Sequence, residues 1–340
     1  MQVSEVCLGS MTWGEQNTQD QAFEQIDYAL DRGINFIDTA EMYAVPPKQE
    51  TCGLTETYIG NWIAANQSRR DEFVLASKIA GPGVPWIREG QAVTGKAINT
   101  AIDGSLARLQ TDYIDLYQIH WPNRTHPHFS KHWPGDVDFS KFDVQQERDG
   151  MLDILRALDE NIKAGKIRYC GLSDETPWGI GEYRHLADKY DLPKMVSIQN
   201  EFNLLHLLDV PYLIESCVLN DMAFLPWSPL GGGALSGKYA NGQKPEGCRW
   251  TMVQRNGIFR DTSQSHEAIA AYKAVADKHG LTLVQLALAW VYQFNGVTSA
   301  IIGATSMEQL KADIDAYDVA LSEGILAEVA SVIKRFPMPF

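Results

Sequence analysis

Eight short segments rich in β-branched and aromatic residues alternate with longer amphipathic segments along almost the whole chain. The β-type segments cover residues 3–9, 34–38, 73–78, 114–120, 169–173, 196–200, 223–228 and 299–303. The clearest helical patterns between them cover residues 20–33, 94–109, 150–166 and 179–193. Parallel strands need such crossover connections, because each strand must start again from the same edge of the sheet. The alternation therefore predicts an α/β fold with a parallel sheet.

Eight such units can close on themselves into a (β/α)₈ TIM barrel, and 340 residues suit that size. A doubly wound open sheet is the alternative, although no G-x-G-x-x-G follows the first β-type segment to support a Rossmann nucleotide site. Neither a linker nor a repeat divides the chain, so we expect one domain over residues 1–340. Three long connections, at residues 81–93, 121–146 and 231–262, predict functional loops at the C-terminal face of the barrel.

Composition excludes several classes of function. The formal charge of −14, with no basic block to offset it, argues against nucleic acid and anionic membrane surfaces as partners. No apolar run reaches membrane-spanning length, and the N-terminus does not resemble a signal peptide. Five cysteines without a C-x-x-C pair indicate reduced thiols, so we expect a cytoplasmic protein. The sequence leaves the oligomeric state open.

Four chemically active side chains lie at or just beyond the ends of three successive β-type segments. In "GINFIDTAEMY" an apolar run stops at Asp38, and Tyr43 follows; the next two segments end at Lys78 and His120. Strand ends form the catalytic face of a parallel barrel, so these four side chains are expected to converge. No single one of them would be informative, but the combination is.

The combination suits the reduction of a carbonyl group. Negative charge develops on the carbonyl oxygen as hydride adds to carbon, and that oxygen must receive a proton. Tyr43 holds a proton at neutral pH, the Lys78 ammonium can stabilise the phenolate, and Asp38 can hold Lys78 in place. His120 can donate a hydrogen bond that orients the carbonyl oxygen.

Motifs spread over nearly the whole chain resemble the aldo-keto reductase family. They are "CLGSMTWG", "GINFIDTAEMY", "ASK", "DLYQIHWP", "GKIRYCGLSD", "IQNEFN", "PWSPLGGGALSGKY" and "IIGATSMEQLKADI". Within the family the sequence looks most similar to the bacterial Tas-like reductases and the potassium-channel β subunits. The resemblance implies a (β/α)₈ barrel, a nicotinamide cofactor (NADPH/NADP⁺) bound without a Rossmann fold, and a catalytic tetrad of Asp38, Tyr43, Lys78 and His120.

The resemblance also implies a set of cofactor-binding positions. Ser173 and Gln199 match the residues that hydrogen-bond the nicotinamide carboxamide, and Trp227 matches the aromatic residue that stacks on the ring. The positions implied for the pyrophosphate and the adenosine phosphates are Ser228, Leu230, Gly231, Lys238, Arg249, Gly303, Thr305 and Gln309. For Trp227, plain core packing is the alternative interpretation.

Four positions depart from the family pattern. Asp174 stands where the family usually has Asn, and an ionised Asp only accepts hydrogen bonds, which puts the usual two-sided amide contact in doubt. Asp313, preceded by Ala312, stands where a Glu-Asn pair usually meets the adenine, and Gln309 replaces an arginine of many members. For both aspartates, a solvated acid without a role is the alternative. The chain also begins at its first strand, without the hairpin that commonly plugs the barrel bottom.

Two other motifs point to different chemistry but lack the necessary context. Residues 232–239, "GGALSGKY", approach a phosphate-binding P-loop, yet Tyr239 replaces the required Ser or Thr. The loop at residues 121–146 contains His126, His128 and His132, but without a regular ligand spacing we predict no metal site. We expect this loop, with its aromatic residues, to cover the substrate.

The function predicted is therefore NADPH-dependent reduction of aldehydes or activated ketones, with Tyr43 as general acid. The alternative is a cofactor-binding regulatory subunit with slow or vestigial chemistry, as in the channel β subunits. His120 argues against that alternative, because the channel β subunits carry Asn at this position. The partner expected is a small carbonyl substrate, whose identity and direction of turnover the sequence leaves open.

Overall fold

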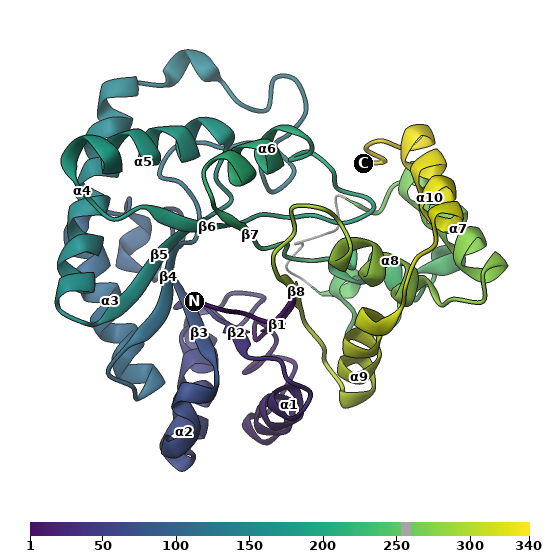
Figure 1. Ribbon diagram of the computed structural model, residues 1–340, viewed down its shortest axis with the longest axis horizontal. Helices are drawn as coiled ribbons and strands as arrows, with labels where there is room; N and C mark the ends of the chain where they lie inside the picture. The colour runs from purple at the N-terminus through teal and green to yellow at the C-terminus, as the bar shows by residue number, and fades with distance from the viewer. Residues whose placement is uncertain (253–259) are drawn as a thin grey trace.

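The computed structural model describes residues 1–252 and 260–340, so the third long connection, at residues 231–262, is described only in part. Eight parallel strands form one sheet, and all eight predicted β-type segments are present. Their bounds are β1 Val6–Gly9, β2 Phe36–Asp38, β3 Val74–Ile79, β4 Ile114–Ile119, β5 Ile167–Ser173, β6 Met195–Gln199, β7 Ala223–Phe224 and β8 Ala300–Ile302. Figure 1 shows the helices arranged around the outside of this sheet.

The strand order decides between the barrel and the open doubly wound sheet. Neighbouring strands follow one another from β7 down to β1, and β8 then pairs with β1. Beyond the named strands, Ile301 N donates to Pro226 O at 2.8 Å and Thr298 N to Phe224 O at 2.9 Å, which joins the β8 segment to the β7 segment. The sheet therefore closes on itself, as a (β/α)₈ barrel requires. The open-sheet alternative is wrong.

The α-helices have the lengths and caps that their sequences favour. Their bounds are α1 Gln19–Asp31, α2 Leu54–Ala65, α3 Gly95–Leu109, α4 Val144–Lys163, α5 Pro177–Tyr190, α6 Tyr212–Leu219, α7 Ser263–Lys278, α8 Leu283–Tyr292, α9 Met307–Asp315 and α10 Glu323–Arg335. Thr18 and Thr94 cap α1 and α3 by accepting hydrogen bonds from backbone N–H groups of the first turn. Helix α4 begins earlier than the apolar pattern predicted, because Asp143 accepts hydrogen bonds from the N–H groups of Gln145 and Gln146.

Apolar side chains fill the barrel below its C-terminal rim. Side chains from five strands and the segment just after β7 form one inner cluster, separate from the larger core between the sheet and the helices; its buried members are Cys7, Phe36, Ala76, Leu116, Leu225 and Ile301. This apolar layer lies directly beneath the rim. Charged groups at the rim are therefore poorly solvated from that side.

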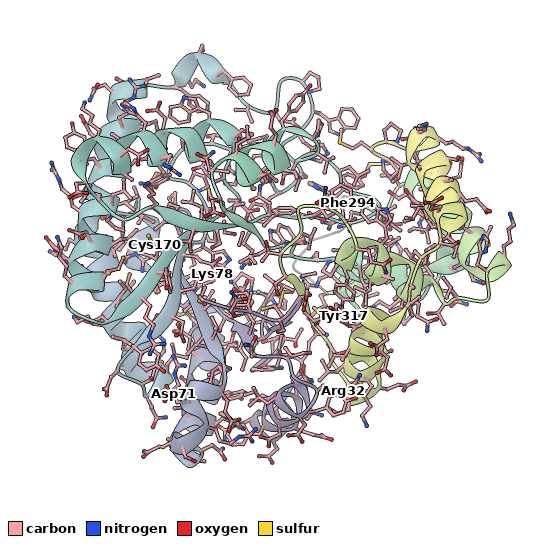
Figure 2. The ribbon with its side chains drawn as sticks, viewed as in Figure 1. Arg32, Asp71, Lys78, Cys170, Phe294 and Tyr317 are labelled. Atoms are coloured by element: carbon pink, nitrogen blue, oxygen red, sulfur yellow. The ribbon has the colours of Figure 1, made fainter. Side chains whose placement is uncertain are left out.

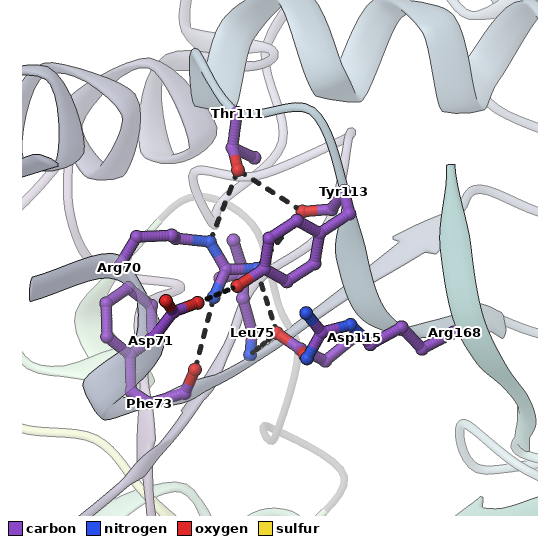
Figure 3. Close-up of polar contacts among 8 residues, drawn as sticks. All are labelled: Arg70, Asp71, Phe73, Leu75, Thr111, Tyr113, Asp115 and Arg168. Carbon is purple, nitrogen blue, oxygen red and sulfur yellow. Dashed lines mark hydrogen bonds and ion pairs between the residues drawn. The ribbon is translucent and has the colours of Figure 1, made fainter. Parts of the chain in front are cut away.

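Arginines clamp the other end of the barrel around β3, β4 and β5 (Figure 3). The Tyr113 ring lies between the guanidinium groups of Arg70 and Arg168, whose carbons are 4.1 and 3.9 Å from its centre. Asp115 accepts hydrogen bonds from both arginines, at 2.8 and 2.9 Å. The clamp joins the starts of three strands far from the rim, so we assign it to stability.

Candidate active site at the barrel rim

Asp38 and Lys78 form an ion pair inside the barrel, at the ends of β2 and β3. The sheet register places Asp38 beside Ala76, so that Lys78, two residues further along β3, reaches back to it. Lys78 Nζ lies 2.5 Å from Asp38 Oδ2 and also donates to the Thr39 carbonyl at 2.8 Å. Figure 2 shows Lys78 near the middle of the molecule, and its side chain is fully buried. Each of the two charges therefore depends on the other for its compensation.

Two glutamines hold the second oxygen of the Asp38 carboxylate. Gln118 Nε2, from β4, donates to Asp38 Oδ1 at 3.2 Å, and Gln199 Nε2, from β6, donates to the same atom at 2.9 Å. Sequence reasoning missed Gln118; the available signal was a polar residue in the otherwise apolar strand "IDLYQI". Gln199 was predicted to bind the nicotinamide carboxamide, and in this structure its amide nitrogen serves Asp38 and Gln118.

Tyr43 and His120 lie beside this ion pair. The Tyr43 and His120 rings meet edge to face with centres 5.5 Å apart, and Lys78 Nζ is 5.1 Å from the centre of the Tyr43 ring. The backbone N–H of Tyr43 donates to Ala40 O, and its carbonyl accepts from Gly53 N, which fixes the loop after β2. The structure thus brings together all four side chains that the strand ends predicted.

The surroundings set the proton affinities of these groups. Burial raises the pKa of Tyr43, outweighing the opposite effect of the nearby Lys78 ammonium. Burial lowers the pKa of Lys78, but Asp38 and Tyr43 favour its charged form, so the net pKa is raised. Burial and the Lys78 charge hold the pKa of His120 well below its usual range. The site therefore contains a protonated phenol, an ammonium and a neutral imidazole at neutral pH.

The segments after β5 and β7 form the opposite side of the rim. Ser173 pairs in register with Gln199, and Asp174 follows in a left-handed conformation with φ of 50°. The Trp227 indole Nε1 donates to Asp174 Oδ1 at 3.3 Å. Trp227 is half-buried: it packs against the inner apolar cluster and also lies beside Phe129 of the long loop, so core packing remains an alternative to a role in binding. Ser173, Asp174 and Trp227 therefore lie together on this side of the rim.

A turn of three glycines follows β7 and is surrounded by basic side chains. Residues 231–233 have φ values of 59°, 65° and 91°, a left-handed run that glycine adopts without strain. A Cβ added to Gly233 would lie 2.8 Å from Lys238 Nζ, and one added to Gly232 would lie 3.9 Å from Arg249 Cγ and from Arg260 Nη1. The N–H groups of Gly231 and Gly233 donate within the turn, to Ser228 O at 2.8 Å and Leu230 O at 3.0 Å, so the cations beside the turn are the groups that suit an anion.

Arg249 differs from the other arginines near the rim. Its guanidinium contacts Met11 Sδ at 3.9 Å, and among residues 1–252 and 260–340 no carboxylate pairs with it. Burial and the neighbouring Arg260 charge lower its pKa. An arginine in such surroundings is poised to bind an anion. Ser228 and Leu230 lie directly before the glycine turn, as the sequence indicated.

The segment from Gly303 to α9 provides the remaining predicted positions. Gln309 Oε1 accepts hydrogen bonds from the backbone N–H and the hydroxyl of Thr305, at 3.0 and 3.1 Å. Asp313 is 4% exposed, so it is no solvated surface acid, and burial raises its pKa to about 7 while the nearby Lys238 acts in the opposite direction. Lys238 therefore lies within electrostatic range of both the glycine turn and the predicted adenine end.

The first part of the loop at residues 121–146 lies over the rim. Arg124 forms a bidentate ion pair with Glu175 and contacts Thr176 at 3.1 Å, which anchors the loop to the start of α5. The Phe129 ring stacks near Trp227, with centres 6.0 Å apart and planes 23° apart. The second part, with Phe139 and Phe142, packs on itself and leads into α4. Sequence reasoning missed the Arg124 anchor, whose partner is distant along the chain.

Other features of the described residues add no second site. Across residues 1–252 and 260–340, no three histidine, cysteine, aspartate or glutamate side chains gather closely enough to hold a metal ion. A cavity of about 440 Å³ opens at the opposite end of the barrel, between Val3, Phe36 and Leu225, and contains none of the predicted site residues. No helix in the described part of the chain is long and apolar enough to span a membrane.

Comparison with known proteins agrees with this arrangement. A family model described as "Aldo/keto reductase family" matches residues 5–334. Protein tas of Escherichia coli is 46% identical over 342 residues, which cover 100% of this chain and 96% of that protein. The uncharacterized oxidoreductase YrpG of Bacillus subtilis is 30% identical, covering 100% and 94%. A probable voltage-gated potassium channel subunit beta of Arabidopsis thaliana is 28% identical, covering 99% and 95%.

Proposed function

This chain belongs to the aldo/keto reductase family and is an oxidoreductase, and on that premise we propose that it reduces aldehydes or activated ketones with NADPH. The observation that carries the proposal is the buried arrangement of Tyr43 beside the Lys78–Asp38 ion pair. A phenol that keeps its proton next to a fixed cation is suited to protonate a developing alkoxide. The family membership supports a nicotinamide cofactor in general, and the phosphate form is the finer part of the proposal.

The residues at the rim fit a dinucleotide phosphate. Lys238 and Arg249, beside the glycine turn at 231–233, supply positive charge within a chain of net charge −14. Trp227 offers an aromatic face, and Ser173 and Asp174 offer polar groups beside it. When bound, the nicotinamide supplies the hydride for the carbonyl carbon.

The side chains of the protein donate the proton and stabilise the charge that develops during the reaction. Tyr43 donates its phenolic proton to the carbonyl oxygen, and the Lys78 ammonium stabilises the phenolate that remains. Asp38, held by two glutamine amides, keeps Lys78 fixed and its charge balanced. Neutral His120 can donate one hydrogen bond to the same carbonyl oxygen without competing for the proton. The loop that Arg124 anchors to Glu175 covers the bound substrate in this proposal and so keeps water from the reacting atoms.

The test follows NADPH absorbance after addition of 4-nitrobenzaldehyde or methylglyoxal to the purified protein. We expect turnover that falls by about 10²–10⁴-fold in Tyr43→Phe, because one acid–base group is lost. Tyr212→Phe is the matched control, since Tyr212 is 71% exposed on α6, and it should leave the rate unchanged. NADPH binding without turnover of any carbonyl would favour the alternative, a cofactor-binding regulatory subunit. The similarity to the Arabidopsis channel subunit supports testing that alternative.

A further inference from the structure

Four carboxyl groups are buried together beside the rim, in the segments that follow β5 and β6. They are Asp174, Glu175, Glu201 and Asp209, none of them more than 8% exposed. Two have an arginine partner: Arg124 forms an ion pair with Glu175, and Arg260 with Glu201. With two guanidinium groups for four carboxyl groups, full ionisation would leave net negative charge in a poorly solvated region, which is costly.

Asp174 has the weakest support for a negative charge. Within residues 1–252 and 260–340, the Trp227 indole, at 3.3 Å, is the one described donor to its side chain. His128 Nδ1, from the long loop, is 3.9 Å from the same Oδ1 atom, which is beyond hydrogen-bonding distance. A buried carboxylate normally accepts several hydrogen bonds, and this one lacks them.

Burial and the neighbouring acids favour the protonated form of Asp174. Burial raises the pKa of its carboxyl group well above the usual range, and the charges of Glu201 and Asp209 raise it further. The Trp227 hydrogen bond and the Lys78 ammonium act against this shift without cancelling it. Tyr43 lies within electrostatic range from the β2 side and remains neutral. His128 also remains neutral, because burial holds its pKa well below its usual range.

We propose that Asp174 keeps its proton in the folded protein and presents a carboxylic acid, with one donor and one acceptor, to the nicotinamide carboxamide. The inference rests on the proposed function and deepens it. A protonated carboxyl group has nearly the shape of an amide and the same two-sided hydrogen-bonding capacity, which an ionised Asp lacks. Cofactor binding then requires a proton at Asp174, so affinity falls once the pH exceeds the pKa of that group in the free protein.

The first test needs no cofactor. Infrared difference spectra of the wild type against Asp174→Asn, at neutral pH, should contain a protonated-carboxyl band that belongs to Asp174. Asp209→Asn is the matched control, because it removes a neighbouring buried acid and should leave the Asp174 band in place. A wild-type spectrum in which Asp174 contributes only carboxylate bands would overturn the proposal, whatever the enzyme's activity.

The second test measures the Kd of NADP⁺ by quenching of tryptophan fluorescence as the pH is raised. In the wild type, affinity should be constant and then fall about tenfold per pH unit above the Asp174 pKa. In Asp174→Asn this fall should disappear.

Two other ligands serve as controls. NAD⁺ should behave like NADP⁺, which separates the effect from titration of the 2′-phosphate. The fragment 2′-phospho-ADP-ribose, which lacks nicotinamide, should show no Asp174-dependent fall. NADP⁺ binding with the same pH dependence in both proteins would overturn this proposal alone; no dinucleotide binding at any pH would overturn the proposed function.

Discussion

Lys78 Nζ lies 2.5 Å from Asp38 Oδ2 in the interior of the barrel, and neither side chain is more than 3% exposed. Replacing one partner leaves the other charge buried and unpaired. We expect Lys78→Met to destabilise the protein by about 3–5 kcal/mol in addition to abolishing turnover. Urea denaturation of the purified variant measures the change.

The double variant Lys78→Met/Asp38→Asn should be more stable than the sum of the two single losses indicates, because it leaves no orphaned charge. Simple additivity would show that the two side chains do not interact. The matched control is Lys273→Met, which removes an exposed ion pair with Asp277 on α7 and should cost less than about 1 kcal/mol.

Gln118 should act as a positioning residue for the tetrad. Its amide donates to Asp38 Oδ1, so Gln118→Leu removes a hydrogen bond to a charged group and loosens Asp38 and Lys78. A bond of that kind contributes about 1.5–3 kcal/mol, so we expect kcat to fall about tenfold or more. The Kd of NADPH and the KM of the carbonyl should change little; a matching loss in cofactor affinity would indicate a general structural role. Gln145→Leu, on the exposed start of α4, is the control.

The loop at residues 121–146 should control the choice of substrate through its first part. Phe129 stacks near Trp227, whereas Phe139 is 70% exposed and contacts Phe142. Phe129→Ala should therefore change kcat/KM ratios among aliphatic and aromatic aldehydes by about tenfold, the scale of a lost aromatic contact plus its buried area. Phe139→Ala should leave the ratios unchanged. Equal effects of the two changes would mean that the loop influences substrate preference through its conformation as a whole and not through the Phe129 contact.

Arg249 should favour the phosphate form of the cofactor. Its side chain passes the glycine turn, and its guanidinium contacts Met11 Sδ without a carboxylate partner in the described part of the chain, so it is available for a phosphate. Arg249→Ala should weaken NADPH binding about ten- to a hundredfold and leave NADH almost unaffected, as isothermal titration would show. Arg156→Ala, exposed on α4, is the control. Equal losses for both cofactors would place Arg249 at the pyrophosphate and make Lys238 the better candidate for the 2′-phosphate.

The contribution of two buried aspartates, Asp209 and Asp313, to stability should fall as the pH rises from about 4 to about 7. Burial raises the pKa of Asp209 and of Asp313 to about 7, whereas an unfolded aspartate titrates near ~3.9. At these two positions the folded state therefore binds more protons in this window, and each group contributes up to about 4 kcal/mol that is lost as the pH rises to its folded pKa.

The variant Asp209→Asn/Asp313→Asn isolates that contribution. The difference in unfolding free energy between wild type and variant should decline with rising pH and become constant above about pH 7. Denaturant unfolding at a series of pH values measures it. A difference that does not depend on pH would show that neither group holds a proton in the folded protein.

The order of elements and the location of the tetrad follow from the sequence alone. A strand places alternate residues on opposite faces, and parallel strands bring their carboxyl ends to one edge, so strand-end positions suffice to predict that Asp38, Lys78 and His120 converge. Tyr43 lies at the same edge because it is in the short loop that follows Asp38. These relationships depend on local pattern, which is why the strands and the barrel were predictable and the structure confirms them.

How each polar group is compensated depends on contacts between distant parts of the chain. Gln118 and Gln199 both serve Asp38, although they are 81 residues apart along the chain. Arg124 pairs with Glu175, whereas no lysine or arginine of residues 1–252 and 260–340 forms an ion pair with Asp174, and nothing in either local sequence distinguishes the two acids. The burial of each group and the partners available to it depend on side chains from many strands. Together they set the pKa of the group. The sequence determined which residues reach the rim; folding decided which of them carry charge there.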